Sequence, residues 1–299
     1  MQNVLQQLVI LYVFLFIGWL IGKVKKDKIG NADILSVLIV NVFLPCKVFN
    51  TFSNNVSVSY FFERWPLLVA SIILLISLVI IARFASKLFT KNEYEQKVYA
   101  YSIPITNYAY LGYVLIGSVF GEEILAEFMF FALPFVFYTY TFGYSLLTNS
   151  KIISKKIINP ITIAIVLGLT FGLAGLKLPK VIITVLSMSS NCVGPLSMLL
   201  TGITLSTFAL RELLSNKTAY IFAFIRLILI PAIAYLICLT AKLTTILPMV
   251  LIITCMPCGL NPIIFPKLIN EDCKPGARLA LITHIFSIAT LPFWLSLII

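Results

Sequence analysis

The stretch LSVLIVNVFLP at residues 35–45 is matched about 150 residues later by LSMSSNCVGP at residues 186–195. Both stretches begin with Leu-Ser, and both end with an asparagine followed four residues later by a proline. The matched pairs are Asn41 with Pro45 and Asn191 with Pro195. This common spacing indicates that the chain contains two copies of one structural unit.

A glycine pattern repeats at the same offset. Gly18 and Gly22 in the first half correspond to Gly168 and Gly172 in the second half. Glycines four residues apart are common in membrane helices, where they allow two backbones to approach closely. Chance similarity between apolar helices would explain one such pair. Matched glycines, asparagines and prolines at one offset favour a duplication instead.

The composition indicates that the chain crosses a membrane many times. Apolar residues make up 60% of the 299 residues and charged residues 11%, which leaves too little polar surface for a soluble globule. A helical span needs about 20 apolar residues. Runs near this length predict an all-α polytopic membrane protein with ten transmembrane helices. The runs are 3–21, 34–53, 65–88, 98–119, 124–148, 159–176, 181–209, 219–240, 246–268 and 277–299.

The lysines and arginines predict the orientation of these spans, because positive charge accumulates in short cytoplasmic loops. Sixteen lie around the loops after spans 1, 3, 5, 7 and 9, whereas four, Arg64, Lys177, Lys180 and Lys242, lie on the opposite side. We therefore expect a plasma (inner) membrane protein with both termini outside. Since this anchoring explains the net charge of +11, no nucleic-acid partner is expected.

Five spans in each half place the second copy upside down in the membrane relative to the first. The predicted fold is therefore two inverted five-helix repeats, a construction typical of secondary transporters. The first repeat covers residues 1–148 and the second covers residues 159–299. A short basic cytoplasmic connector at residues 149–158 joins them.

The fourth and ninth spans contain helix breakers in mid-membrane. They read YSIPITNYAYLGYVLIG at residues 101–117 and TCMPCGLNPIIFPKL at residues 254–268. Proline removes a backbone donor and clashes with the preceding turn, so these helices should unwind at Pro104, Pro257 and Pro262. Such broken backbone persists in a bilayer only where protein or water supplies hydrogen bonds.

Asn107 and Asn261, which follow these prolines, can supply such hydrogen bonds because each amide has donors and an acceptor. Two broken helices that cross near the midplane would place helix ends around a shared cavity. Helix amino ends favour an anion and carbonyl ends favour a cation. The second and seventh spans, with their asparagine and proline pairs, should be disrupted similarly and line the same cavity. The alternative is a pair of simple proline kinks with asparagines packed between helices.

Ionisable residues inside spans are candidate functional groups. Lys47 lies near the middle of the second span and is the predicted contact for a substrate carboxylate, unless its long side chain reaches the membrane surface. Arg226 and His284 lie in spans 8 and 10, where hydrogen bonding or packing explains both, although both are also candidates for proton or ion coupling, and His284 could carry the proton. Ser197 occupies the position that matches Lys47, so the repeats differ there.

The acidic residues all lie in loops or at span ends, which argues against carboxylate proton relays and intramembrane proteases. No Ser/His nucleophile arrangement is evident, so we do not expect an enzyme. The six cysteines lie mostly within spans, where they act as small apolar residues. We expect no disulfide, metal site or cofactor.

Four motifs resemble the auxin efflux carrier family: FLPCKVF in the second span, NYAYLGYVL in the fourth, SNCVGPLSMLLTGITLS in the seventh and MPCGLNPIIF in the ninth. The family covers plant auxin exporters and many bacterial permeases, and it is related to the bile acid/sodium symporters. The resemblance implies broken fourth and ninth helices that cross at the substrate site. It also implies transport by an elevator-like movement of one part of the protein against another.

By matched motif, the crossover prolines would be Pro104 and Pro257, and Asn107 and Asn261 would lie beside the substrate. Tyr108 belongs to the same motif and is a further candidate contact, and Thr106, directly before the motif, is a supporting residue. Plant auxin exporters carry a large central loop, which the short connector here lacks. Sodium sites in the bile acid relatives use acidic and amide side chains, and this chain offers no acid there.

The sequence thus predicts a secondary carrier of a small organic anion, such as malate or an auxin-like acid, in a lipid environment. The predicted contacts are Lys47, Asn107, Tyr108, Asn191 and Asn261. The alternatives are a sodium- or proton-coupled symporter of the bile acid type and a ligand sensor or channel-like protein. The oligomeric state is left open, and a homodimer is among the arrangements that the sequence allows.

Overall fold

The computed structural model describes residues 2–24, 32–150 and 158–298. These residues form helices and loops, with one isolated antiparallel bridge and no strand among them. The prediction of an all-α chain is therefore confirmed for the described residues. Most of the connector predicted at 149–158 lies outside them.

Six described helices are long and apolar enough to cross a membrane, and a seventh span results if one helix pair bent by 49° counts as one. They confirm a multi-pass membrane protein. The other three predicted spans, 98–119, 159–176 and 246–268, are interrupted or shorter, and they stay predictions. The six are Asn3–Val24, Ile34–Asn55, Val58–Phe89, Lys180–Ser206, Lys217–Thr240 and Lys274–Ser296, and the bent pair is Glu122–Phe131 with Leu133–Thr148.

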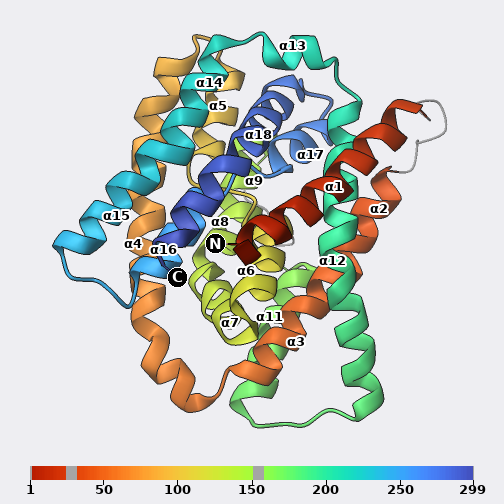
Figure 1. Ribbon diagram of the computed structural model, residues 1–299, viewed down its shortest axis with the longest axis vertical. Helices are drawn as coiled ribbons and strands as arrows, with labels where there is room; N and C mark the ends of the chain where they lie inside the picture. Colours follow the sequence, from red (N-terminus) through yellow and green to blue (C-terminus); the bar gives the residue numbers. More distant parts are fainter. Residues whose placement is uncertain (1, 25–31, 151–157, 299) are drawn as a thin grey trace.

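One set of helices packs mainly among its own members, and we call it the lateral group. In Figure 1, α1, α2 and α12 of this group lie on the right of the view. The most extensive contact in the set joins α1 to α12, and the next most extensive joins α11 to α3. The group consists of α1 (Gln2–Val24), α2 (Ala32–Leu38), η1 (Ile39–Phe43), α3 (Leu44–Asn55), α11 (Pro160–Leu173) and α12 (Lys180–Ser206).

The remaining helices form a second set, which we call the central group. Its outer members α4, α14 and α15 lie on the left in Figure 1. The group consists of α4 (Val58–Phe89), α5 (Glu93–Ser102), η2 (Tyr108–Gly112), α6 (Tyr113–Phe120), α7 (Glu122–Phe131), α8 (Leu133–Tyr138), η3 (Thr139–Gly143), α9 (Tyr144–Thr148), α13 (Leu210–Leu214), α14 (Lys217–Phe224), η4 (Ile225–Leu229), α15 (Ile230–Thr240), α16 (Leu247–Cys255), α17 (Asn261–Lys267) and α18 (Lys274–Ser296).

The repeated glycines lie at the close contacts of the lateral group. A Cβ atom on Gly18 would collide with the backbone of Leu199 in α12, and one on Gly172 would collide with the carbonyl of Val56 at the end of α3. Glycine permits this approach because it has no side chain. The first helix of each sequence copy therefore packs against the second helix of the other copy.

The prolines of the second and seventh predicted spans have milder effects than expected. Pro45 follows the π-helical turn η1 and begins a regular helix, α3. Pro195 lies inside α12, which continues without interruption from Lys180 to Ser206. The expectation that Pro195 disrupts its span is therefore wrong. Ser197 supports this part of α12 by donating a hydrogen bond to the Gly194 carbonyl at 3.1 Å.

Counterpart connections of the two sequence copies lie at opposite ends of the molecule. Figure 1 shows the α3 to α4 connection, between the second and third helices of the first copy, at the bottom, and its counterpart from α12 through α13 to α14 at the top. Capping fixes some of these helix starts: Ser57 caps α4 by accepting from the Tyr60 N–H, and Asn159 caps α11 in a capping box with Thr162. The interrupted segments at 103–107 and 256–260 lie in the interior, where all their residues except the half-buried Gly259 are buried.

Candidate functional site

The interrupted segments of the fourth and ninth predicted spans meet inside the central group. Thr106 and Cys258 form an antiparallel bridge, and the Asn107 N–H donates to the Pro257 carbonyl at 2.7 Å. Pro104 and Pro257 interrupt the helices here because they cannot donate to the preceding turn. The two broken segments thus share a backbone hydrogen bond, and the Cys258 N–H donates to the Thr283 hydroxyl of α18.

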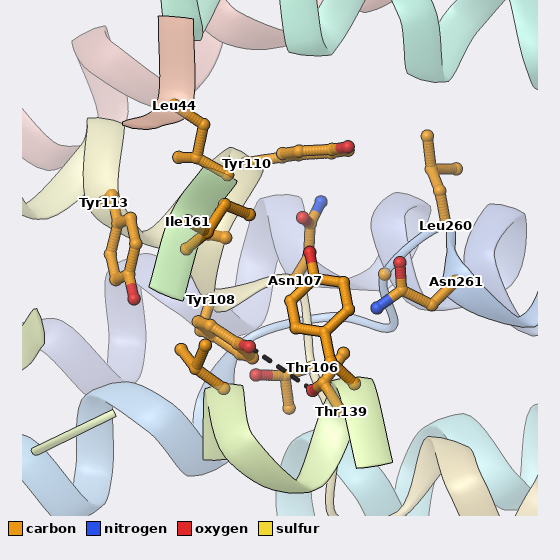
Figure 2. A pocket seen from close by; sticks show the side chains of 14 residues that line it. Leu44, Thr106, Asn107, Tyr108, Tyr110, Tyr113, Thr139, Ile161, Leu260 and Asn261 are labelled. Atoms are coloured by element: carbon orange, nitrogen blue, oxygen red, sulfur yellow. Dashed lines mark hydrogen bonds between the residues drawn. The ribbon is translucent and has the colours of Figure 1, made fainter. Parts of the chain in front are cut away.

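A polar pocket of about 40 Å³ lies beside this contact (Figure 2), which is room for a few water molecules at about 10–15 Å³ each. Leu44 of α3 and Ile161 of α11 close it from the lateral group, so it lies between the two groups. Its lining is uncharged. The lining residues are Leu44, Thr106, Asn107, Tyr108, Ala109, Tyr110, Tyr113, Val136, Thr139, Tyr140, Ile161, Gly259, Leu260 and Asn261.

The two pocket asparagines are held by partners from distant parts of the chain. The Asn107 amide nitrogen lies 3.1 Å from Nε2 of His284 in α18. The Asn261 amide nitrogen donates to the Tyr101 hydroxyl at 2.8 Å. Among the described residues neither amide oxygen has a hydrogen-bond partner. Both asparagines can therefore present their side-chain carbonyl groups to a ligand.

Tyrosine and threonine hydroxyls supply most of the other polar groups of the pocket. Tyr108 and Thr139 share a hydrogen bond of 3.3 Å, drawn as the dashed line in Figure 2, and Thr139 also donates to the Phe135 carbonyl. The buried Thr106 hydroxyl has no partner within the described part of the chain. A buried hydroxyl without a partner costs free energy, so a ligand that bonds it would be favoured.

Two helix starts also face the pocket. Tyr108 and Tyr110 belong to the first turn of the helix Tyr108–Phe120, and Asn261 begins α17. The first N–H groups of a helix lack partners within the helix and carry partial positive charge. An uncharged pocket lined by such groups and by hydroxyls offers several donors to a carboxylate.

Arg226 offsets the partial negative charge at the carbonyl end of α16, the helix that precedes the second break. This arginine of η4 is fully buried, and its guanidinium donates to the carbonyls of Thr254 and Ile253 at the end of α16. A positive charge is favourable at the carbonyl end of a helix. Arg226 therefore occupies the position where exposed carbonyls would otherwise attract a cation.

Lys47 is buried, but it does not line the pocket. It follows the lining residue Leu44 by almost one turn of α3, and its Nζ lies 3.8 Å from where a Cβ on Gly117 of α6 would be. Oε1 of Glu122 lies 3.5 Å from the same point, and the other carboxylate oxygen accepts from Thr51 at 3.2 Å. Lys47 and Glu122 thus form a charged cluster one turn away from the pocket.

The structure brings together some of the predicted residues and not others. Thr106, Asn107, Tyr108 and Asn261 line one pocket, and Pro104 and Pro257 lie in the segments that build it. Pro262 lies in the first turn of α17 behind Asn261. The side chains of Asn41 and Asn191 are exposed on η1 and α12, outside the pocket lining, because α12 continues as a regular helix and turns Asn191 outward.

Several lining residues were not predicted from the sequence. Tyr110, Tyr113 and Tyr140 supply hydroxyls, and Tyr101 orients Asn261. The sequence signal for these residues is the high density of tyrosines around the first helix break. Those tyrosines lie within an apolar run, so they do not stand out as polar groups. No group of three or more potential metal ligands occurs among the described histidine, cysteine, aspartate and glutamate residues.

An all-helical membrane protein with a polar pocket at the meeting point of two broken helices has an arrangement typical of membrane transporters. The model of the family described as "Membrane transport protein" matches residues 3–152 and again residues 145–295. The chain belongs to this family, which confirms the resemblance to auxin efflux carriers. The relation to bile acid symporters stays a prediction.

A relative with a curated description agrees with this class. The protein named "Uncharacterized transporter MJ1031" from Methanocaldococcus jannaschii is 27% identical to this chain. The alignment covers 95% of this chain and 96% of the relative. Both comparisons support a transporter, and neither names a substrate.

Proposed function

We propose that the protein is a secondary carrier of a small organic anion, such as malate or an auxin-like acid, which binds in the pocket between the lateral and central groups. The observation that carries this proposal is the start of the helix Tyr108–Phe120 in an uncharged pocket with hydroxyl and amide side chains. Backbone N–H groups at a helix start favour an anion. Asn107, Tyr108 and Asn261 are the proposed contacts.

We further propose that the chain consists of two inverted five-helix repeats, 1–148 and 159–299, with crossing fourth and ninth helices. Support comes from the family model, which matches the two halves separately, and from the reciprocal packing of α1 with α12 and of α11 with α3. In this proposal the central group moves against the lateral group in an elevator-like manner. The pocket, which at about 40 Å³ is too small for an organic acid in this state, would then widen as it opens to either side in turn.

Lys47 has a role beside the pocket in this proposal. Lys47 lies about one helical turn from the lining residue Leu44. From there its positive charge can attract an anion toward the pocket without contacting the bound anion. Glu122 lies close by and offsets part of the lysine charge. Asn191 is not needed as a contact. The location in a plasma membrane, the termini outside and a homodimer stay predictions.

Sodium is not required in the proposed mechanism, because Arg226 already neutralises the carbonyls at the end of α16. In a sodium symporter such carbonyls and nearby side chains would bind the ion. We therefore expect malate uptake into liposomes to be the same in sodium and in choline buffers. Uptake that depends on sodium would support the symporter alternative instead.

The central test is binding of malate and indole-3-acetate to the purified protein by isothermal titration calorimetry. We expect one site for each probe that binds, and saturable uptake into liposomes at rates far below those of a channel. Carboxylate binding that Asn107→Ala and Asn261→Ala leave unchanged would contradict the proposed site. Binding without transport would favour the ligand sensor.

A further inference from the structure

His284 is a buried residue of α18 that connects to the pocket through one side chain. Its exposed fraction is 2%, and its ring lies between two polar groups. Nδ1 lies 2.7 Å from the Ala280 carbonyl oxygen, and Nε2 lies 3.1 Å from the amide nitrogen of Asn107. Asn107 in turn lines the pocket. The ring is thus one side chain away from the proposed substrate.

The hydrogen bonds determine which nitrogen of the neutral ring carries the proton. A backbone carbonyl can only accept, so Nδ1 must donate to Ala280. A neutral imidazole has one N–H group, which leaves Nε2 as an acceptor for the Asn107 amide N–H. The Asn107 amide oxygen is then directed away from the ring, and it has no partner among the described residues. This arrangement presents an acceptor to the pocket, which disfavours an anion.

Protonation of the ring reverses this polarity. Both ring nitrogens then donate, so Nε2–H faces the Asn107 amide nitrogen, which cannot accept. Rotation of the amide by half a turn restores the hydrogen bond, because Oδ1 then accepts from Nε2. The amide nitrogen then points toward the pocket and offers donors to an anion. The added positive charge favours the anion as well.

We propose that His284 is the proton-binding site of this carrier, and that rotation of the Asn107 amide links its protonation to anion binding in the pocket. The inference rests on the proposed function as an anion carrier and names its coupling ion. Binding of the proton and binding of the anion each favour the other, so the two are carried together. This reciprocity is required of any two linked sites.

The ionisable groups described around α18 bond to partners other than the ring nitrogens of His284, so the ring can take up a proton without breaking an ion pair. Tyr12 of α1 packs edge-on against the ring at 6.2 Å between centroids, while its hydroxyl bonds the His284 main-chain carbonyl and Ser287. Arg226 of η4 bonds the carbonyls of α16. Other charged groups facing α18 lie six or more residues before the ring, roughly 9 Å or more along the helix. They are Glu95 of α5 with Arg278 and Glu212 of α13 with Lys274.

The thiols of Cys255 and Cys258, from α16 and the second broken segment, bond backbone carbonyls. They compete for neither ring nitrogen. Asn261 provides the internal contrast, because its amide nitrogen bonds the Tyr101 hydroxyl, which does not change its charge near neutral pH. Only the Asn107 side of the pocket can therefore change polarity with pH.

The first experiment uses the full-length wild-type protein without any anion. His284 is the one histidine in the sequence, so protein labelled with ¹⁵N-histidine gives the ring signals of a single site. We expect the neutral ring at pH 8 to carry its proton on Nδ1. A neutral ring with its proton on Nε2 would overturn the proposed switch, and it would leave the anion site itself untouched.

The second experiment measures malate affinity between pH 6 and 8.5, where ordinary carboxyl groups stay ionised. Wild-type affinity should rise toward low pH by up to about tenfold per pH unit over the range in which the ring takes up its proton. His284→Gln, whose side chain does not titrate, should bind malate with no such rise, and Tyr12→Phe should keep the rise. A wild-type affinity independent of pH, or an unchanged rise in His284→Gln, would overturn the proposal. Loss of malate binding in the wild type at every pH would instead contradict the proposed function for this probe.

Discussion

The two helix breaks that meet at the Thr106–Cys258 bridge are similar in sequence but different in their surroundings. Each combines a proline with an asparagine a few residues later, and each asparagine lines the pocket. The first asparagine, Asn107, contacts an ionisable imidazole, whereas Asn261 contacts the Tyr101 hydroxyl. The first break can therefore respond to pH, and the second has a fixed polarity near neutral pH.

The helix halves before the two breaks also end differently. The chain itself satisfies the end of α5, because the N–H groups of Ile103 and Ile105 donate to carbonyls of Tyr99 and Tyr101. The end of α16 relies on the Arg226 side chain from η4. The two breaks thus acquire distinct chemistry from side chains that lie elsewhere in the sequence.

The largest expected effect comes from removing the support of the second break. Arg226→Leu leaves the carbonyls of Ile253 and Thr254 unpaired, at about 1–3 kcal/mol for each buried group. We expect an apparent melting temperature lower by roughly 2–4 °C per kcal/mol, measured in detergent by fluorescence-detected size-exclusion chromatography.

Arg226→Lys should lose less, because an ammonium group can still donate to one or both carbonyls. Arg211→Leu is the matched control, since Arg211 is exposed on α13 and should change little. A wild-type melting temperature for Arg226→Leu would mean that the end of α16 does not depend on this side chain.

The next effect compares the two asparagines directly. Each alanine variant removes an amide donor to a charged ligand, which is the rotated amide of Asn107 and the second amide hydrogen of Asn261, worth about 1.5–3 kcal/mol, or roughly tenfold to 150-fold in affinity. Titration calorimetry with malate should show a loss that depends on pH for Asn107→Ala and a loss that is constant with pH for Asn261→Ala.

Asn191→Ala is the control for this pair, because the exposed side chain lies outside the pocket lining. We expect malate affinity to be unchanged. A tenfold loss in this control would restore the sequence-based assignment of Asn191 as a contact. Equal pH profiles for the two pocket variants would remove the proposed difference between the breaks.

The breaks were predictable from the sequence because proline has a local effect on the helix that contains it. Pro104 and Pro257, with their asparagines, were identified in this way. The partners of the asparagines were not predictable, since Asn107 and His284 are separated by 177 residues. Such a contact depends on how α18 packs against the first break, which no local pattern encodes.

Lys47 is a second residue whose neighbours could not be predicted from the sequence. Its depth in a span marked it as functional, and it is indeed buried, with an exposed fraction of 8%. The position of Glu122 beside it depends on packing of α3 against α7 and could not be predicted. The outward direction of Asn191 likewise follows from α12 continuing as a helix past Pro195, where a break had been expected.

Replacing Lys47, which lies beside the pocket, should have a smaller effect on transport. Lys47→Met removes a positive charge about one turn from Leu44, so malate uptake into liposomes should slow several-fold while affinity changes less. Lys47→Arg should keep most of the rate because it keeps the charge. The difference between Lys47→Met and wild type should shrink as ionic strength rises. A loss of affinity larger than the loss of rate would instead make Lys47 a direct contact.

The smallest effect concerns the partner of the second asparagine. Tyr101→Phe removes the hydroxyl that holds the Asn261 amide nitrogen, a neutral hydrogen bond worth about 0.5–1.5 kcal/mol, so malate affinity should fall roughly twofold to tenfold. Tyr60→Phe is the control, because the buried Tyr60 hydroxyl has no partner among the described residues. The loss in Tyr101→Phe should be the same at pH 6 and pH 8, since neither Tyr101 nor Asn261 changes its charge in this range. A loss that varied with pH would show that the second break also senses protonation, and the two breaks would then differ in degree and not in kind.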